Sequence, residues 1–196
     1  MRTAIRLVAL GAIAAILAVT PLQATILKQM NLADLAGNAN RIFSGTVIDI
    51  GKGKLDVGGG TIATVTYRVM VDEAFRGEFG ENEGKRVVEI RMVTDPGPRR
   101  SGDKVAFAVL PQMPDIQMGQ RYLFFTTAPS AVGLSTTVGL GQGCFRISGA
   151  PGEEVTANEF DNLGLFRGMS VPGAPERGPI AYSSLVQQID ALLGRK

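Results

Sequence analysis

The chain contains no histidine, no tryptophan and one cysteine in 196 residues. Without histidine it lacks the usual general base, the Ser/His and Cys/His nucleophile pairs and the usual zinc ligand sets. Two carboxylates would suffice for a glycosidase, but the lack of tryptophan and an aromatic content of 6% do not indicate a sugar-stacking cleft. Ser135 lacks the closing glycine of a nucleophile elbow. We therefore predict a protein that is not an enzyme, with no catalytic, cofactor-binding or metal-binding residues.

Because there is only one cysteine, the chain cannot form an internal disulfide. Cys144 lies between Gly143 and Phe145 in an expected strand, so we interpret it as a small buried hydrophobic residue. An intermolecular disulfide and a reactive thiol are the alternatives. Titration of the native protein with a thiol reagent distinguishes them, because a buried thiol reacts slowly.

Residues 1–24 have the pattern of a secretory signal peptide. Arg2 and Arg6 form a basic start, Leu7 to Val19 is an uncharged apolar run, and Ala24 is a small residue at the expected cleavage site. An uncleaved membrane anchor is the alternative, but the apolar run is shorter than the roughly 18 residues that a span needs. The pattern predicts a protein exported to the periplasm or the medium, with no stable membrane span after cleavage.

Removal of the leader changes the charge balance. The whole chain has 20 Lys plus Arg and 18 Asp plus Glu, and the loss of Arg2 and Arg6 leaves 18 basic and 18 acidic residues. Proteins that bind nucleic acid need a basic surface to neutralise phosphates. The balanced mature chain therefore predicts no nucleic-acid partner.

The most regular pattern in the chain is the stretch from Thr61 to Phe75. Alternate residues of a strand point to opposite sides of a sheet. Apolar side chains recur here at every second position, whereas polar ones occupy the other face. The expected apolar face is Ala63, Val65, Tyr67, Val69, Val71 and Phe75.

Further short apolar runs predict a small antiparallel β-barrel over residues 25–148. The expected strands are Arg41–Ile50, Arg86–Thr94, Lys104–Leu110, Gly119–Thr127, Leu134–Leu140 and Cys144–Ile147. Gly51–Gly60 is expected to be a flexible connection, since it contains five glycines. The run Gly119–Thr127 is apolar on both faces, which favours a central strand covered on each side.

Helices are expected near the two ends of the mature chain. Asn31 is a good N-cap for a short helix that carries Leu32 and Leu35. Residues 149–182 are rich in Gly, Pro, Glu and Asn and are expected to form an irregular surface excursion held by a few apolar side chains. Residues 183–194 form an amphipathic pattern, with Ser184 and Gln187 as a capping box, and are expected to dock on the barrel.

Five blocks resemble a family of uncharacterised exported bacterial proteins: Asn31-Leu32-Ala33-Asp34-Leu35, Ile42 to Val47, Tyr67 to Gly77, Met118 to Phe125 and Val138 to Arg146. The resemblance implies an OB-like β-barrel similar to netrin-like modules and to tissue inhibitors of metalloproteinases. It implies no functional residues. The sequence departs from those inhibitors at the expected mature N-terminus, where Thr25 replaces their metal-binding cysteine.

Two functional hypotheses of different classes follow. In the first, the barrel is an interaction module whose rim loops or exposed edge strand bind another exported protein, with a protease as the candidate. In the second, the barrel interior or the space beneath the terminal helix carries a small apolar ligand. The sequence does not identify the binding residues of either.

Overall fold

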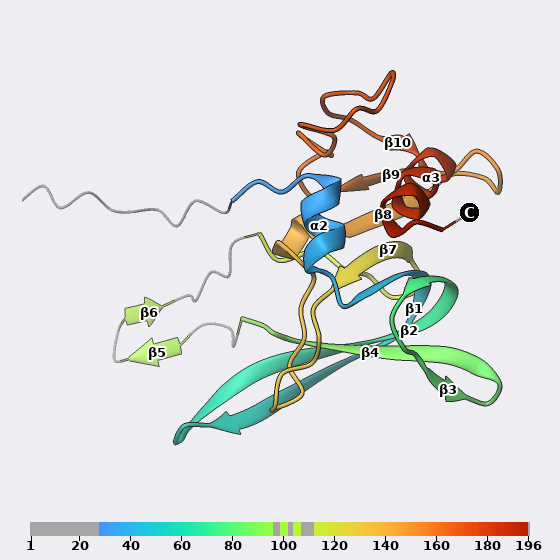
Figure 1. Ribbon diagram of the computed structural model, residues 1–196. Coiled ribbons are helices and arrows are strands. Elements are labelled where there is room, and N and C mark those ends of the chain that lie inside the picture. The colour runs from blue at the N-terminus through green and yellow to red at the C-terminus, as the bar shows by residue number, and fades with distance from the viewer. Residues whose placement is uncertain (1–27, 96–98, 102–103, 107–111, 196) are drawn as a thin grey trace, which may run out of the picture.

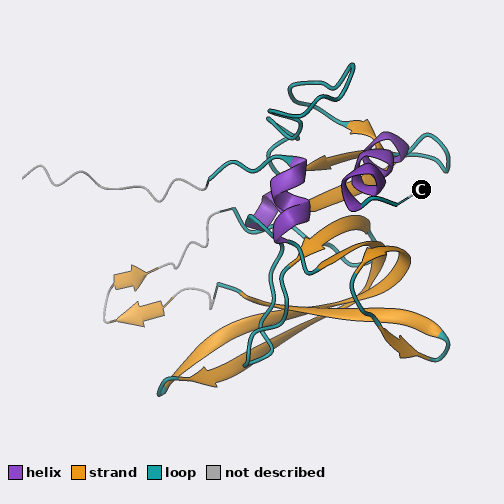
Figure 2. Ribbon diagram, in the orientation of Figure 1, coloured by secondary structure: helices purple, strands orange, loops and turns teal. Residues whose placement is uncertain are grey.

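The computed structural model describes residues 28–95, 99–101, 104–106 and 112–195. An antiparallel eight-stranded sheet has the order β10-β9-β8-β7-β1-β2-β4-β3, and β5 and β6 form a separate ribbon (Figures 1 and 2). The strands are β1 Arg41–Val57, β2 Gly60–Arg76, β3 Gly80–Asn82, β4 Lys85–Val93, β5 Arg99–Ser101, β6 Lys104–Ala106, β7 Arg121–Thr126, β8 Cys144–Ser148, β9 Val155–Asn158 and β10 Ile180–Ala181. The helices are α2 Leu32–Asn38, the short 3₁₀ helix η1 Leu140–Gly143, and α3 Tyr182–Leu193.

The predicted mainly-β class is confirmed, with one helix towards each end of the described chain. The expected signal peptide lies outside the described residues, as do positions 107–110 of the expected strand Lys104–Leu110. The barrel is not closed, because the sheet order is linear and no described strand joins β10 to β3.

The segment 134–138 crosses the gap in the barrel with isolated backbone hydrogen bonds. The Ser135 N–H donates to the Arg91 carbonyl at 2.8 Å, and the Val138 N–H donates to the Phe125 carbonyl at 2.8 Å. The predicted strand Leu134–Leu140 is therefore wrong, since only one isolated bridge forms there. Gly139 and Leu140 have φ values of 62° and 55°. This left-handed backbone cannot continue a strand and turns the chain into η1.

Strand β7 separates two hydrophobic cores. Its side chains alternate, with Tyr122 and Phe124 on one face and Leu123 and Phe125 on the other. The prediction of a central strand with both faces covered is confirmed. One core, here called the barrel core, lies inside the curved sheet and includes Phe43, Val47, Val69, Val88, Ile90 and Met92. The other, the helix-side core, lies under the helices and includes Leu32, Leu35, Phe145, Leu165, Leu185 and Ile189.

The predicted apolar face of β2 is correct up to Val71 and wrong at Phe75. Val65, Val69 and Val71 are buried in the barrel core, whereas Phe75 lies in the helix-side core. The cause is a β-bulge, because the pairing with β1 skips Asp72. One extra residue reverses the side-chain alternation beyond it.

The region predicted as a flexible connection, Gly51–Gly60, is a β-hairpin instead. β1 continues to Val57, β2 begins at Gly60, and only Gly58 and Gly59 form the turn, with φ values of 62° and 80°. A two-residue turn of this type needs positive φ at both positions, which glycine adopts without strain. The remaining glycines of this region lie within the strands.

Gly45 permits the closest approach of β1 to β2. A Cβ atom at this position would lie 2.7 Å from Val69 Cγ1 and would also clash with the Met70 backbone oxygen. Only a residue without a side chain fits there. This glycine therefore leaves the space that Val69 and the Met70 backbone of β2 occupy beside β1.

The expected N-cap of α2 is confirmed. Asn31 Oδ1 accepts from the Asp34 N–H at 2.8 Å, and Asp34 accepts in return from the Asn31 N–H. The expected capping box of Ser184 is wrong, because α3 begins at Tyr182 without a side-chain cap. Strand β10 leads directly into α3, and the Tyr182 N–H donates to the Glu154 carbonyl instead.

The segment 149–182 is not irregular throughout, because it contributes β9 and β10 to the sheet. Apolar side chains hold this segment to the body as predicted, since Leu165 is buried in the helix-side core and Phe166 packs against it, whereas Leu163 is exposed. Within α3, Leu185 and Ile189 are fully buried, so this helix docks on the sheet.

Candidate functional site

The β1–β2 hairpin extends beyond the body of the sheet. Strand β7 pairs with β1 only over Arg41–Thr46, and Val47 exchanges backbone hydrogen bonds with Gly119 and Gln120. From Ile48 onwards, β1 has a partner on one side only, and the hairpin projects at the lower left of Figures 1 and 2. In the described part of the chain, no backbone pairs with its other side.

The register fixes which backbone groups face outward. Val57 and Gly60 close a two-residue turn, and in such a hairpin the closing pair exchanges hydrogen bonds with each other. Residues of β1 then alternate, so the N–H and C=O groups of Ile50, Lys52, Lys54 and Asp56 point away from β2. We call this row of groups the open edge.

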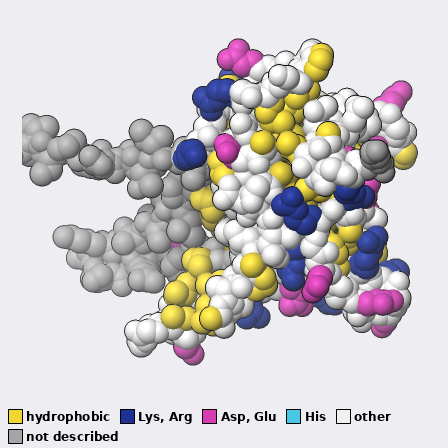
Figure 3. All heavy atoms as spheres, in the orientation of Figure 1, with side chains coloured by type: hydrophobic (Ala, Val, Ile, Leu, Met, Phe, Trp, Pro, Cys, Tyr) yellow, Lys and Arg dark blue, Asp and Glu magenta, His cyan; other side chains and the backbone are white. Residues whose placement is uncertain are grey.

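The side chains along the open edge differ between its two faces. Ile50, Lys52, Lys54 and Asp56 lie on the face that continues the barrel core, where Ile50 packs. The opposite face carries two glycines, followed by Leu55 and the exposed Val57. Figure 3 shows hydrophobic side chains gathered over this projecting part of the molecule.

The other sheet edges are short or occupied. Strand β3 pairs with the first residues of β4. Further along the same edge of β4, the Ser135 N–H donates a hydrogen bond to the Arg91 carbonyl. At the opposite end, β10 is only two residues long. An unpaired strand edge is a template for another chain. Among the described strands, β1 offers the longest such template.

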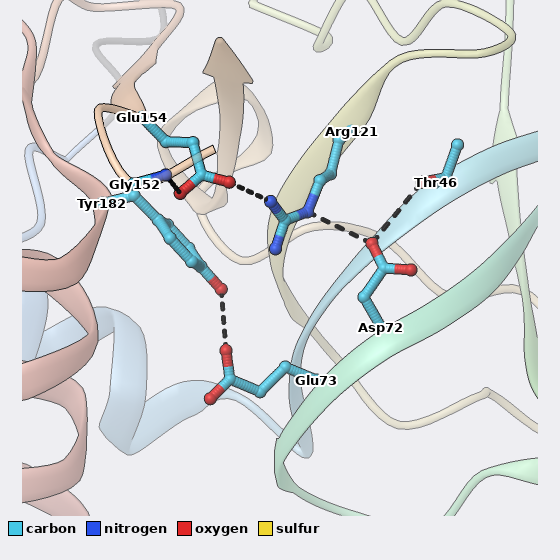
Figure 4. Close-up of polar contacts among 7 residues, drawn as sticks. All are labelled: Thr46, Asp72, Glu73, Arg121, Gly152, Glu154 and Tyr182. Atoms are coloured by element: carbon cyan, nitrogen blue, oxygen red, sulfur yellow. Dashed lines mark hydrogen bonds and ion pairs between the residues drawn. The ribbon is translucent and has the colours of Figure 1, made fainter. Parts of the chain in front are cut away.

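A cluster of charged residues joins the sheet to α3 (Figure 4). Arg121 of β7 lies between two carboxylates, with Nη1 at 2.6 Å from Glu154 and Nε at 3.2 Å from Asp72. Its guanidinium lies 5.2 Å from the centre of the Tyr182 ring, and the Tyr182 hydroxyl donates to Glu73 at 3.1 Å. These contacts connect β2, β7, the β8–β9 turn and the start of α3.

The chemistry of this cluster is that of a structural brace. Burial, together with the nearby Glu73 carboxylate, raises the pKa of Tyr182 to about 12, so its hydroxyl stays neutral. The carboxylates of the cluster, Asp72, Glu73 and Glu154, each have an ion-pair or hydrogen-bond partner within it.

A polar hollow of about 330 Å³ lies beside β8 and β9. Arg146 points into it, 3.9 Å from Asp115 and 5.9 Å from the centre of the Tyr122 ring. The Asp115 N–H donates to Glu159 at 3.1 Å. The charges of Arg146 and Asp115 in this hollow therefore neutralise one another in part.

Cys144 lies beneath the same hollow, with 4% of its surface exposed, and its predicted burial is confirmed. Burial raises the pKa of the thiol, so the thiolate needed for reaction is scarce. Ser135 is also buried. Over the described ranges, no three cysteine and carboxylate groups converge as metal ligands would.

The second hypothesis placed a ligand inside the barrel or under α3. Large side chains occupy both places, including Phe43 and Phe124 inside the barrel and Leu185 under the helix, all with 0% exposure. A more apolar hollow of about 370 Å³ lies at the surface instead, where Phe166, Met169 and Val171 form part of its wall.

Sequence reasoning missed the open edge because it assigned Gly51–Gly60 to a flexible connection. A usable signal was present, since Leu55 and Val57 alternate before Gly58-Gly59 and predict a hairpin. The contacts of Arg121 had no local signal, because its partners lie 33 and 49 residues away.

No protein-family model matches this chain, and no curated protein sequence is significantly similar to it. In the part of the chain that the structure describes, no helix has the length and apolarity needed to cross a membrane.

Proposed function

We propose that this chain is a non-catalytic exported interaction module that binds another exported protein through the projecting β1–β2 hairpin. The periplasm or the external medium is its proposed location, as the leader pattern indicates. A protease is the first partner class to test, given the resemblance to tissue inhibitors of metalloproteinases.

The observation that carries the proposal is the contrast between the packed body and the hairpin. Interior residues such as Val47, Phe124 and Leu185 are fully buried. In contrast, β1 beyond Ile48 has a partner on one side only among the described residues. Backbone groups along such a strand are satisfied by water until another chain replaces it.

Site-specific photo-crosslinking in the producing cells tests the proposal. A photoreactive amino acid at Lys54 should join the chain to one protein of the cell envelope in a distinct adduct. The same group at Arg177, which is exposed on the 149–182 segment, is the matched control. Absence of an adduct at position 54, or the same adducts at both positions, would contradict the proposal.

A small apolar ligand is the second candidate function, favoured by the surface hollow beside Phe166. Its volume of about 370 Å³ falls in the range of ligand sites. Native mass spectrometry of protein purified from its own envelope should then show a retained small mass. Substitution of Phe166 by Glu should release that mass, whereas substitution of the exposed Val132 by Glu should not.

A further inference from the structure

We infer that the open edge of β1 accepts an extended acidic polypeptide segment as an additional strand. This inference rests on the proposed interaction function and specifies the chemistry of the partner. It combines three observations: the unpaired backbone of residues 50–56, the two lysines on that edge, and Gly51 and Gly53 beside them.

The backbone determines the conformation of the partner. The outward N–H and C=O groups recur at every second residue from Ile50 to Asp56, as on any unpaired strand edge. A helix cannot match this spacing, whereas an extended chain of about seven residues can. The partner segment must therefore be extended and free of proline at the positions that donate.

The lysines of the open edge determine the charge of the partner segment. Lys52 and Lys54 project from the same face of β1 and are exposed. Residues directly opposite one another in a sheet interact through their side chains, and opposite charges stabilise the pair. A partner strand with Asp or Glu opposite both lysines is favoured, whereas Lys or Arg there is disfavoured.

The opposite face determines the apolar character of the partner. Gly51 and Gly53 leave this face of β1 flat, and a Cβ added at Gly51 would meet no atom within 4 Å. Leu55 and Val57 follow on the same side. Large apolar residues of an added strand could cover the glycines and contact these two side chains. The preferred segment thus alternates acidic and apolar residues.

A second copy of this chain does not fit the full length of the edge. A two-fold antiparallel pairing centred on residue 53 places Lys52 opposite Lys54, and one centred on residue 55, which pairs Lys54 with Asp56, leaves Ile50 and Lys52 without a partner strand. Like charges directly opposite one another are destabilising. Edge lysines also oppose aggregation, which is consistent with an edge reserved for a different, acidic partner.

Amide hydrogen exchange by NMR tests this inference on the isotope-labelled exported protein. The probes are a blocked ten-residue peptide of alternating Glu and Val and the same peptide with Lys in place of Glu. At concentrations up to about 1 mM, the Glu peptide should slow exchange at the amides of Ile50, Lys52, Lys54 and Asp56. It should bind about fivefold more tightly than the Lys peptide, because its charge pairs with Lys52 and Lys54 outweigh one repulsion from Asp56 on the same face.

Two variants make the test specific. Lys52→Pro removes one outward N–H and one of the two lysines without removing a hydrogen bond to β2, so the hairpin should form but bind the Glu peptide at least tenfold more weakly. The double variant Lys52→Glu with Lys54→Glu should prefer the Lys peptide. Reversal of this preference supports the charge argument, and its absence contradicts it.

The outcomes distinguish this inference from the proposed function. If the crosslinker at Lys54 captures a protein but the Glu peptide leaves the four outward amides unprotected, strand addition is overturned and the interaction function stands. Equal binding of both peptides overturns the acidic preference. Protection that survives the Lys52→Pro substitution unchanged overturns the assignment of the edge.

Discussion

Substitution of Val69 by Asp should unfold the protein or leave it barely stable at neutral pH. Val69 is fully buried in the barrel core, and burial of a valine side chain stabilises a protein by about 1.5 to 3 kcal/mol. A buried carboxyl group has its pKa raised by about 3 to 5 units, at about 1.36 kcal/mol for each unit. At pH 7 this electrostatic cost is limited to about 4 kcal/mol, because a carboxyl with a higher folded-state pKa stays protonated. The expected loss is therefore about 5 to 7 kcal/mol, against a total stability of about 5 to 15 kcal/mol.

Thr66→Asp is the matched control on the same strand. Thr66 is half-buried on the outer face of β2, and the Arg91 Nε donates to its hydroxyl at 3.3 Å. A carboxylate at this position would face a guanidinium and water, so the change in stability should stay within about 0.5 kcal/mol. Urea unfolding followed by circular dichroism at pH 7 measures both variants.

The pH dependence of the Val69→Asp variant adds a second check. The folded-state pKa of the new carboxyl would lie above its unfolded-state value of about 3.9. The electrostatic penalty should therefore be absent below pH 3.9 and grow as the pH rises towards the folded-state pKa. Similar unfolding midpoints for Val69→Asp and Thr66→Asp at pH 7 would refute the assignment of the two faces of β2.

Three further predictions concern the brace, the glycine contact and a tyrosine. Arg121→Met should lower the free energy of unfolding in urea by about 2 kcal/mol, whereas Arg177→Met, which removes an exposed ion pair, should lower it by less than about 0.5 kcal/mol. Equal losses would contradict the bracing role of Arg121. Gly45→Ala should destabilise by about 1 to 3 kcal/mol through the clash with β2, and Gly51→Ala should fold normally with a similar melting temperature. In an ultraviolet titration, Tyr182 should ionise near pH 12 and not near pH 10, and Tyr182→Phe should remove this late transition. The stability that the Tyr182 hydroxyl contributes should be complete below pH 10 and lost between pH 10 and 12.

The local sequence was sufficient to predict the class of the fold and several strands. Alternation of apolar residues identified the buried face of β2 up to Val71, because side chains of a strand point alternately to its two faces, and β4 was also predicted as a strand. The continuous apolar run of β7 correctly indicated two covered faces. The N-cap of α2 was also predictable, since Asn31 and Asp34 contact each other within one turn.

The candidate site was less predictable than the fold. The glycine content of Gly51–Gly60 suggested a loop, although only Gly58 and Gly59 form the turn. No local pattern distinguishes a glycine that pairs in a strand from one that turns the chain, because both conformations are open to it. The edge itself also depends on how far β7 extends along β1, which is a property of the partner strand.

What the sequence alone determined is thus the set of elements whose signal lies within a few residues: the period of two in the strands, the apolar run of β7, and the period of 3.6 in α3. Only the tertiary structure decided the bulge at Asp72 that turns Phe75 to the helix side, the failure of the barrel to close, and the brace around Arg121. The physical reason is the distance along the sequence between the residues that interact. Side-chain periodicity is set by the backbone of one strand, whereas register, closure and ion pairs depend on which distant segments fit against one another.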